Sequence, residues 1–192
     1  MKYKPKEIAL FGTSADPPTN GHKAIIKELS KIFSLVISYA SDNPSKKHKE
    51  ILTYRSLLLR ILIEDLNNPS VLFDQELSSP WAIKSIKRCK QKYNPDKIKF
   101  VIGSDLINQM LSWKNFNEII TECDLFIIPR EGYPINPLTI KSINNTNAKY
   151  EISKFIVPNI SSSMIREKNL YKKLPRSLVD VIKNKNLYRN LK

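Results

Sequence analysis

Short apolar runs alternate along this chain with segments whose apolar residues recur at helical spacing. The runs are typical of buried strands, and they predict strands over residues 8–11, 35–40, 71–73, 98–103, 125–128 and 155–157. The spaced segments predict amphipathic helices over residues 23–33, 54–66, 81–93 and 106–113, with a final helix near the C-terminal end. The Asn-rich stretch 142–149 is predicted to be a surface loop.

Strands that alternate with helices favour a parallel sheet covered on both faces. Right-handed crossovers then give an α/β, Rossmann-like doubly wound fold, in which ligands bind at the carboxyl ends of the strands. The chain has no internal repeat and no compositional boundary. We therefore expect a single domain over residues 1–192, with a C-terminal helical segment.

The turn between the first strand and the first helix carries the first candidate site. Its small and polar residues are Gly12, Thr13, Ser14, Thr19 and Gly21. They stand where a helix exposes unpaired N–H groups, and that end of a helix attracts phosphate. His22 adds an imidazole on the first helical turn, so the segment predicts a phosphate cradle with a histidine directed into it. The alternative is that His22 and Thr19 only occupy the start of a helix and bind no ligand.

A second cradle is predicted at residues 160–166, where serines precede an arginine. Ser162 and Ser163 stand at a helix start, where hydroxyls and free N–H groups can hold a triphosphate. Arg166 follows Ser163 by three residues, so both lie on one helical face. The alternative is an ordinary serine cap beside a surface arginine.

Further polar residues follow other predicted strands. Gly103 closes one strand, and Asp105 behind it could bond ribose hydroxyls or simply start a helix. Arg130 after the next strand could pair with phosphate or carboxylate, or be a solvated loop residue. Lys46 lies in a basic run that is by itself a solvated loop, and it is our candidate for a phosphate contact.

Charge and composition narrow the class of protein. The formal net charge is +14, which suits nucleic-acid binding or the steering of anionic nucleotides. The many lysines on polar helix faces and the absence of an RNA-binding aromatic signature favour compositional bias with modest steering, so we expect no specific nucleic-acid partner. No apolar run approaches a membrane span, and two cysteines without a C-x-x-C pair favour a reducing cytoplasm.

The first motif resembles the signature of the nucleotidyltransferase superfamily: a glycine-containing turn, Asp-Pro, then Thr or His, any residue, Gly and His. Asp16-Pro17 and Thr19-Asn20-Gly21-His22 match it. The chain is similar in particular to the nicotinate-nucleotide adenylyltransferase family. Residues 160–166 match its Ile-Ser-Ser-Thr-x-Ile-Arg block, with Ser163 in the threonine position, and Gly103-Ser104-Asp105 followed by Trp113 matches a further block.

The resemblance implies transfer of AMP from ATP to nicotinate mononucleotide, with Mg²⁺ carried mainly by the phosphates. It implies a catalytic role for His22, Thr19, Lys46 and Arg166. It also implies that Trp113 stacks on the pyridine ring. Relatives have an aromatic-Thr pair near Trp81-Ala82, so a backbone contact to the pyridine carboxylate would survive here but a hydroxyl contact would not.

Three alternatives stay open at this point. A different superfamily transferase would use nicotinamide mononucleotide, phosphopantetheine or a CTP-dependent acceptor. A nucleic-acid-binding protein would explain the charge, and a catalytically inactive nucleotide sensor would keep the same cradle.

Overall fold

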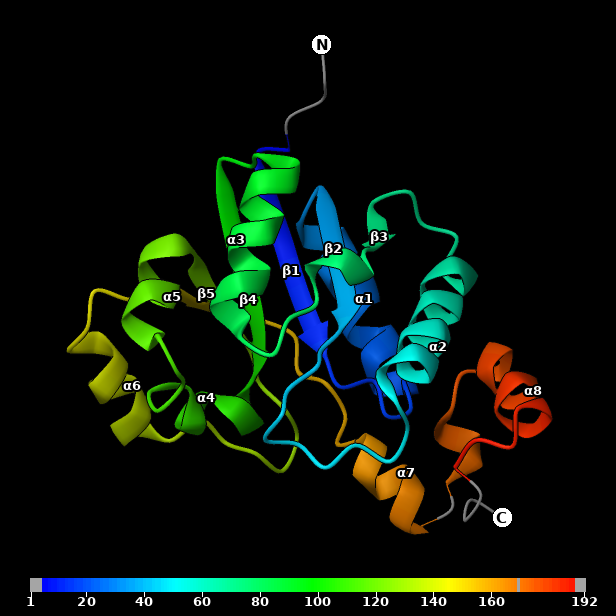
Figure 1. Cartoon of the computed structure of the whole chain (residues 1–192). Coiled ribbons are helices and arrows are strands. Elements are labelled where there is room, and N and C mark those ends of the chain that lie inside the picture. Colours follow the sequence, from blue (N-terminus) through cyan, green and yellow to red (C-terminus); the bar gives the residue numbers. More distant parts are fainter. Residues whose placement is uncertain (1–4, 169, 189–192) are drawn as a thin grey trace.

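A parallel six-stranded sheet forms the centre of the protein, in a computed structural model whose described residues are 5–168 and 170–188 (Figure 1). The strands are β1 (Glu7–Thr13), β2 (Leu35–Ala40), β3 (Val71–Phe73), β4 (Lys97–Gly103), β5 (Asp124–Ile128) and β6 (Tyr150–Ile152). Their order is β3-β2-β1-β4-β5-β6. The chain adds β2 and β3 on one side of β1 and then β4, β5 and β6 on the other, so the strand order reverses between β1 and β4. The predicted Rossmann-like doubly wound fold is confirmed.

The register of the central strands brings their carboxyl ends to one edge. Leu10 of β1 lies beside Ile37 of β2 on one side and Phe100 of β4 on the other. All of these pairs are parallel. The loops that leave β1, β2, β4 and β5 therefore gather at the same edge, which is where open α/β sheets bind ligands.

Helices cover both faces of this sheet. They are α1 (Asn20–Ile32), α2 (Leu52–Asp65), α3 (Ala82–Tyr93), α4 (Ser104–Met110), α5 (Phe116–Glu122), α6 (Pro137–Asn144), α7 (Ser162–Lys168) and α8 (Arg176–Asn184), with short 3₁₀ turns at Gln75–Leu77 and Tyr171–Lys173. Figure 1 shows α3 in front of the sheet and α1 behind it. None of the described helices is both long and apolar enough to cross a membrane.

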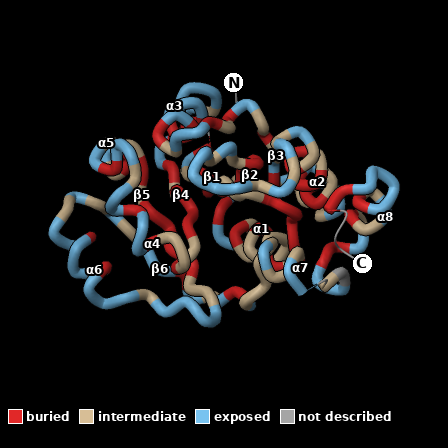
Figure 2. Tube along the Cα trace, turned by 60° about the horizontal axis from the view of Figure 1, so that its bottom comes forward, coloured by how far each residue is buried: buried red, intermediate tan, exposed pale blue. Residues whose placement is uncertain are grey.

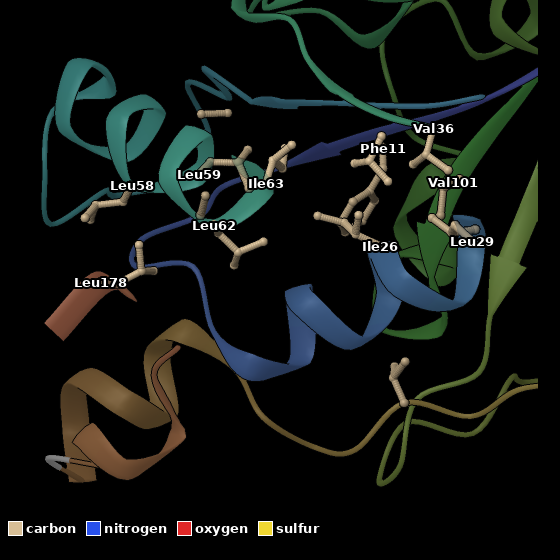
Figure 3. Close-up of a cluster of buried hydrophobic side chains, with 14 of the residues drawn as sticks. Phe11, Ile26, Leu29, Val36, Leu58, Leu59, Leu62, Ile63, Val101 and Leu178 are labelled. Carbon is tan, nitrogen blue, oxygen red and sulfur yellow. The ribbon is translucent and has the colours of Figure 1, made fainter. Parts of the chain in front are cut away.

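Two cores form because successive residues of a strand point to opposite faces. Ala9 and Phe11 of β1 pack with α1, α2 and α8 (Figure 3), whereas Ile8 and Leu10 pack with α3, α4 and α5. The near-continuous apolar strands are buried on both faces, as a covered parallel sheet requires. Figure 2 shows the buried residues along the strands and the exposed residues on the outer sides of the helices.

The last predicted strand is wrong. Residues 155–157 form no strand, and Val157 makes only an isolated bridge to Arg130. The sixth strand is instead Tyr150–Ile152, which lies at the sheet edge with two exposed residues. An edge strand needs no continuous apolar run, and the apolar run at 155–157 is used to pack Phe155 and Val157 against the core.

Three helical details also differ from the prediction. The chain folds α5 where no helix was expected, and α6 reaches Asn144, so the first residues of the predicted 142–149 loop are helical. The helix expected over 106–113 is α4, which ends at Met110. Trp113 therefore lies in the turn beyond α4, where its N–H bonds the Met110 carbonyl at 3.0 Å.

We expect Phe126→Ala to lower the free energy of unfolding by about 3–5 kcal/mol, because it leaves a cavity in the larger core. Phe126 is 1% exposed, and its ring meets Phe33 edge-on at 5.1 Å. Urea denaturation measures the change. Leu138→Ala is the matched control, since Leu138 is 70% exposed and should lose little. Equal losses in both variants would contradict this packing.

Candidate active site

A cavity of about 810 Å³ opens at the carboxyl ends of the strands. Its walls come from the turn after β1, the loop after β2, the start of α3, the β4–α4 junction, the residue after β5 and the start of α7. These segments are far apart in the sequence. The parallel sheet brings these segments together because each of them follows the carboxyl end of a strand or lies opposite those ends.

All but one of the predicted site residues line this cavity. They are Gly12, Thr13, Ser14, Gly21, His22, Lys46, Trp81, Gly103, Asp105, Trp113, Arg130, Ser162, Ser163 and Arg166. The exception is Thr19, which is completely buried beneath the start of α1.

Thr19 and His22 hold each other at the start of α1. The Thr19 hydroxyl oxygen accepts hydrogen bonds from the N–H groups of Gly21 (3.1 Å) and His22 (3.4 Å). The Thr19 N–H donates to Nδ1 of His22 at 3.0 Å, and the Thr19 hydroxyl lies 2.9 Å from the same nitrogen. This reciprocal capping box satisfies orphan helix donors and fixes the imidazole. These contacts let Thr19 position His22, whereas its own side chain is buried and does not line the cavity.

The same contacts set the protonation of His22. Burial, together with the charges of Arg130 and Lys46, lowers its pKa to about 4, so the ring is neutral at pH 7. Nδ1 accepts the Thr19 N–H, and the ring proton is accordingly assigned to Nε2. A neutral ring beside two cations offers an N–H donor to an anion in the cavity.

Glycine is required at two places because other parts of the chain come close. A Cβ on Gly21 would lie 2.9 Å from the carbonyl oxygen of Ile160, which precedes α7. A Cβ on Gly12 would lie 2.6 Å from the Tyr39 ring. Gly21 thus lets the starts of α1 and α7 approach each other, and the two predicted phosphate cradles become one surface.

A buried arginine and a buried aspartate tie the cavity loops together. Arg55 is 1% exposed and donates to the carbonyls of Ser14 (2.7 Å), Ser41 (2.8 Å) and Glu50 (3.1 Å). Asp16 is 2% exposed and accepts from the N–H groups of Lys49 (2.7 Å) and Glu50 (3.2 Å). Both groups join the turn after β1 to the loop after β2, so Arg55 has a structural role.

The start of α7 presents hydroxyls and a guanidinium to the cavity. Ser162 donates to the Pro17 carbonyl at 2.8 Å, which docks α7 on the turn after β1. Arg166 donates to the backbone carbonyl of Asp16, and its Nη2 donates to Ser163 Oγ at 3.2 Å. Its Nη1 also lies 3.6 Å from the Asp16 carboxylate. These contacts fix the orientation of the Arg166 guanidinium, and the side chain still lines the cavity.

The ends of β4 and β5 contribute an ion pair. Arg130 Nη1 donates to Asp105 Oδ2 at 3.0 Å. Ser104 does not cap α4. Its hydroxyl instead accepts the Arg130 N–H at 2.9 Å and donates to the Tyr133 carbonyl at 2.6 Å. Desolvation and the charge of Arg130 lower the pKa of Lys46, whereas Asp105 opposes the shift. Three predicted site residues thus share one electrostatic cluster.

Two tryptophans and a lysine form another part of the wall. Trp113 is half-buried, and its ring meets Phe100 edge-on at 6.3 Å. Trp81 is more exposed, and the ammonium of Lys114 lies 4.6 Å from its ring centroid. All three side chains line the cavity. Flat apolar surfaces beside a cation suit an aromatic ring that carries a negative substituent.

Sequence reasoning missed three contributors to this site. Asp16 was assigned no role, although its carboxylate anchors the loop after β2. His48 lines the cavity with its Nδ1 3.8 Å from Asp16, and its buried Nε2 has no hydrogen-bond partner within the described part of the chain. Lys114 also went unnoticed. Neither His48 nor Lys114 carries a local signal, because only the fold places them at the cavity.

Comparison with known proteins agrees with this geometry. The cytidylyltransferase-like family model matches residues 10–168. A Synechocystis protein named "Probable nicotinate-nucleotide adenylyltransferase" is 34% identical, over 95% of this chain and 99% of that protein. A Helicobacter pylori protein of the same name is 31% identical, over 84% and 91%.

A solved structure shares the fold. Plasmodium falciparum nicotinic acid mononucleotide adenylyltransferase complexed with NaAD superposes with a TM-score of 0.76 at 21% identity, over 96% of this chain and 98% of that one. From its cavity, its fold and its relatives, this chain belongs to the cytidylyltransferase-like family and, within it, to the nicotinate-nucleotide adenylyltransferases.

Proposed function

We propose that this protein transfers AMP from ATP to nicotinate mononucleotide, a step of NAD biosynthesis that gives deamido-NAD and pyrophosphate. The observation that carries the proposal is the neutral, capped His22 in the cavity, with its Nε2–H available to an anion. The names of the relatives support the same reaction.

The reaction needs no protein nucleophile. A phosphate oxygen of the mononucleotide forms a bond to the α-phosphorus of ATP as the bond from that phosphorus to the bridging oxygen breaks. Pyrophosphate leaves with the electron pair. Because the attacking group is already anionic, catalysis consists of positioning and charge stabilisation. His22 donates its Nε2–H to the α-phosphate as negative charge develops there.

The triphosphate lies between the starts of α1 and α7. Ser162, Ser163 and the guanidinium of Arg166 face the leaving pyrophosphate from α7, and Lys46 approaches from the loop after β2. On the other side of the triphosphate, residues 12–14 and Gly21 line the cavity, and their small side chains let the phosphates approach the backbone. Thr19 contributes indirectly, by holding the imidazole of His22.

The mononucleotide occupies the part of the cavity at the ends of β4 and β5. Asp105 binds ribose hydroxyls beside Gly103, and Arg130, which is its ion-pair partner, faces the mononucleotide from β5. Trp113 stacks on the pyridine ring, with Trp81 as a second aromatic wall. Two indoles fit a flat pyridine better than the flexible chain of phosphopantetheine.

Magnesium enters as part of the Mg·ATP substrate. Among the described residues, no three His, Cys, Asp or Glu side chains gather into a metal site. Asp16 and Asp105 line the cavity, but each already faces an arginine. A Mg²⁺ ion carried by the phosphates would supply charge neutralisation there.

The function is tested with purified protein, ATP and Mg²⁺, to which each candidate acceptor is added in turn. We expect pyrophosphate release with nicotinate mononucleotide and formation of the dinucleotide in equal amount, and no turnover with phosphopantetheine. A coupled pyrophosphate assay and chromatography measure the two products. Turnover with phosphopantetheine alone would reject the proposal.

His22 is tested with two variants that separate its two nitrogens. His22→Ala and His22→Asn should each lower turnover by roughly two to four orders of magnitude, because the Nε2–H donor is lost. His22→Ala should also lose about 1 kcal/mol of stability, since the capping contact disappears. The asparagine oxygen can still accept the Thr19 N–H, so His22→Asn should stay close to wild-type stability.

Steady-state kinetics and thermal unfolding on the same preparations give both quantities. The KM for ATP should change less than turnover, because Arg166 and backbone N–H groups remain. Near-normal turnover of a folded His22→Asn protein would remove His22 from the mechanism.

Trp113→Ala should raise the KM for the mononucleotide by roughly 5- to 150-fold, the effect of losing one stacked ring. The KM for ATP should stay nearly constant. Trp113→Phe keeps a flat ring and should recover most of the affinity. Because Trp113 also packs on Phe100, thermal melting accompanies each titration. A large drop in melting temperature with unaltered mononucleotide binding would reject the stacking role.

A further inference from the structure

The connection between α4 and α5 places a cation in the aromatic part of the cavity. Lys114 directly follows Trp113, and Asn115 then turns the chain into α5 with a left-handed φ of 63°. The Lys114 ammonium lies 4.6 Å from the centroid of the Trp81 ring, which comes from the start of α3. Contact with the indole restricts a long, otherwise flexible side chain, and it leaves the ammonium N–H groups free to donate.

Among the residues that the structure describes, this ammonium has no anionic partner, whereas the arginines of the cavity do. Arg130 is paired with Asp105, and Arg166 faces Asp16. Within residues 5–168 and 170–188, no carboxylate lies within 4.0 Å of Lys114. The carboxylate of Glu118, in the first turn of α5, is bonded to Lys87 and to the Asn115 side chain. The charge of Lys114 is therefore available to a ligand.

From this geometry we infer that Lys114 binds the carboxylate on the pyridine ring and makes the enzyme select the acid over the amide. The inference rests on the proposed function. Nicotinate and nicotinamide mononucleotides share the same phosphate and ribose, so Lys46, Arg166 and Asp105 act on both equally. The two molecules differ only in the ring substituent, so a group that faces this substituent must distinguish them, and the Lys114 ammonium lies against the Trp81 ring in the aromatic part of the cavity.

The side chain at position 82 strengthens this assignment. Ala82, next to Trp81, lines the cavity but carries no hydroxyl that could bond the ring substituent. An ammonium is a donor only, so it favours a carboxylate and gives a neutral amide no comparable charge interaction.

Lys114→Met is the decisive variant, because it keeps an unbranched apolar side chain against Trp81 and removes the charge. Lys114→Arg keeps the charge. Lys84→Met is the matched control, since Lys84 is an exposed lysine of α3 outside the cavity and its loss changes the net charge equally. Each protein is assayed with ATP and with both mononucleotides, and its thermal unfolding is recorded.

In Lys114→Met we expect kcat/KM for nicotinate mononucleotide to fall about 10-fold through KM, the scale of one charged hydrogen bond. The value for nicotinamide mononucleotide should change little, so the preference for the acid falls by the same factor. Lys114→Arg should retain most of that preference, and Lys84→Met all of it. An unchanged preference in folded Lys114→Met, or an equal loss for both substrates, would overturn the inference while leaving the proposed function intact. A wild-type protein that used neither mononucleotide would instead reject the function itself and the inference with it.

Discussion

The site depends on the burial of two opposite charges between the same pair of loops. Asp16 and Arg55 are almost fully buried, and burying an ion is costly unless every polar atom finds a partner. Here the partners are backbone groups of the turn after β1 and the loop after β2. Both charges therefore hold the same two loops against each other. Removing the Asp16 carboxylate would leave the N–H groups of Lys49 and Glu50 without this acceptor, and removing Arg55 would leave its backbone carbonyls without this donor, so either change would loosen the loop that carries Lys46.

Around that anchor, one local arrangement performs several tasks. The contact between Thr19 and His22 caps the N-terminus of α1, fixes the imidazole and keeps its Nδ1 as an acceptor. Burial and neighbouring cations then keep the ring neutral. A side chain that is neutral, oriented and close to cations can donate to a phosphate without first losing a hydration shell, and such preorganisation is the main source of catalysis in phosphoryl transfer.

The positively charged side chains of this protein are held in defined positions mainly at the cavity. Most lysines lie on exposed helix faces or pair with carboxylates on the surface, as Lys87 does with Glu118. At the cavity, by contrast, arginines are held by carboxylates and carbonyls that orient them, and Lys114 is held by an indole. These fixed charges can distinguish ligands, whereas the overall charge of +14 can only attract anions in general.

The sequence by itself determined the layer architecture, the helix starts that form the two phosphate cradles, and a set of candidate residues nearly all of which line the cavity, because these depend on local periodicity, capping chemistry and recognisable motifs. It could not place β6, since an exposed edge strand carries no apolar run, and it assigned a strand to residues 155–157, whose apolar side chains serve the core instead. It could not show that Thr19 is completely buried, or that Arg55 is a buried anchor. Only the tertiary structure decided that Asp16, His48 and Lys114 lie at the cavity, because their partners are brought near by the parallel sheet and not by neighbouring positions in the chain.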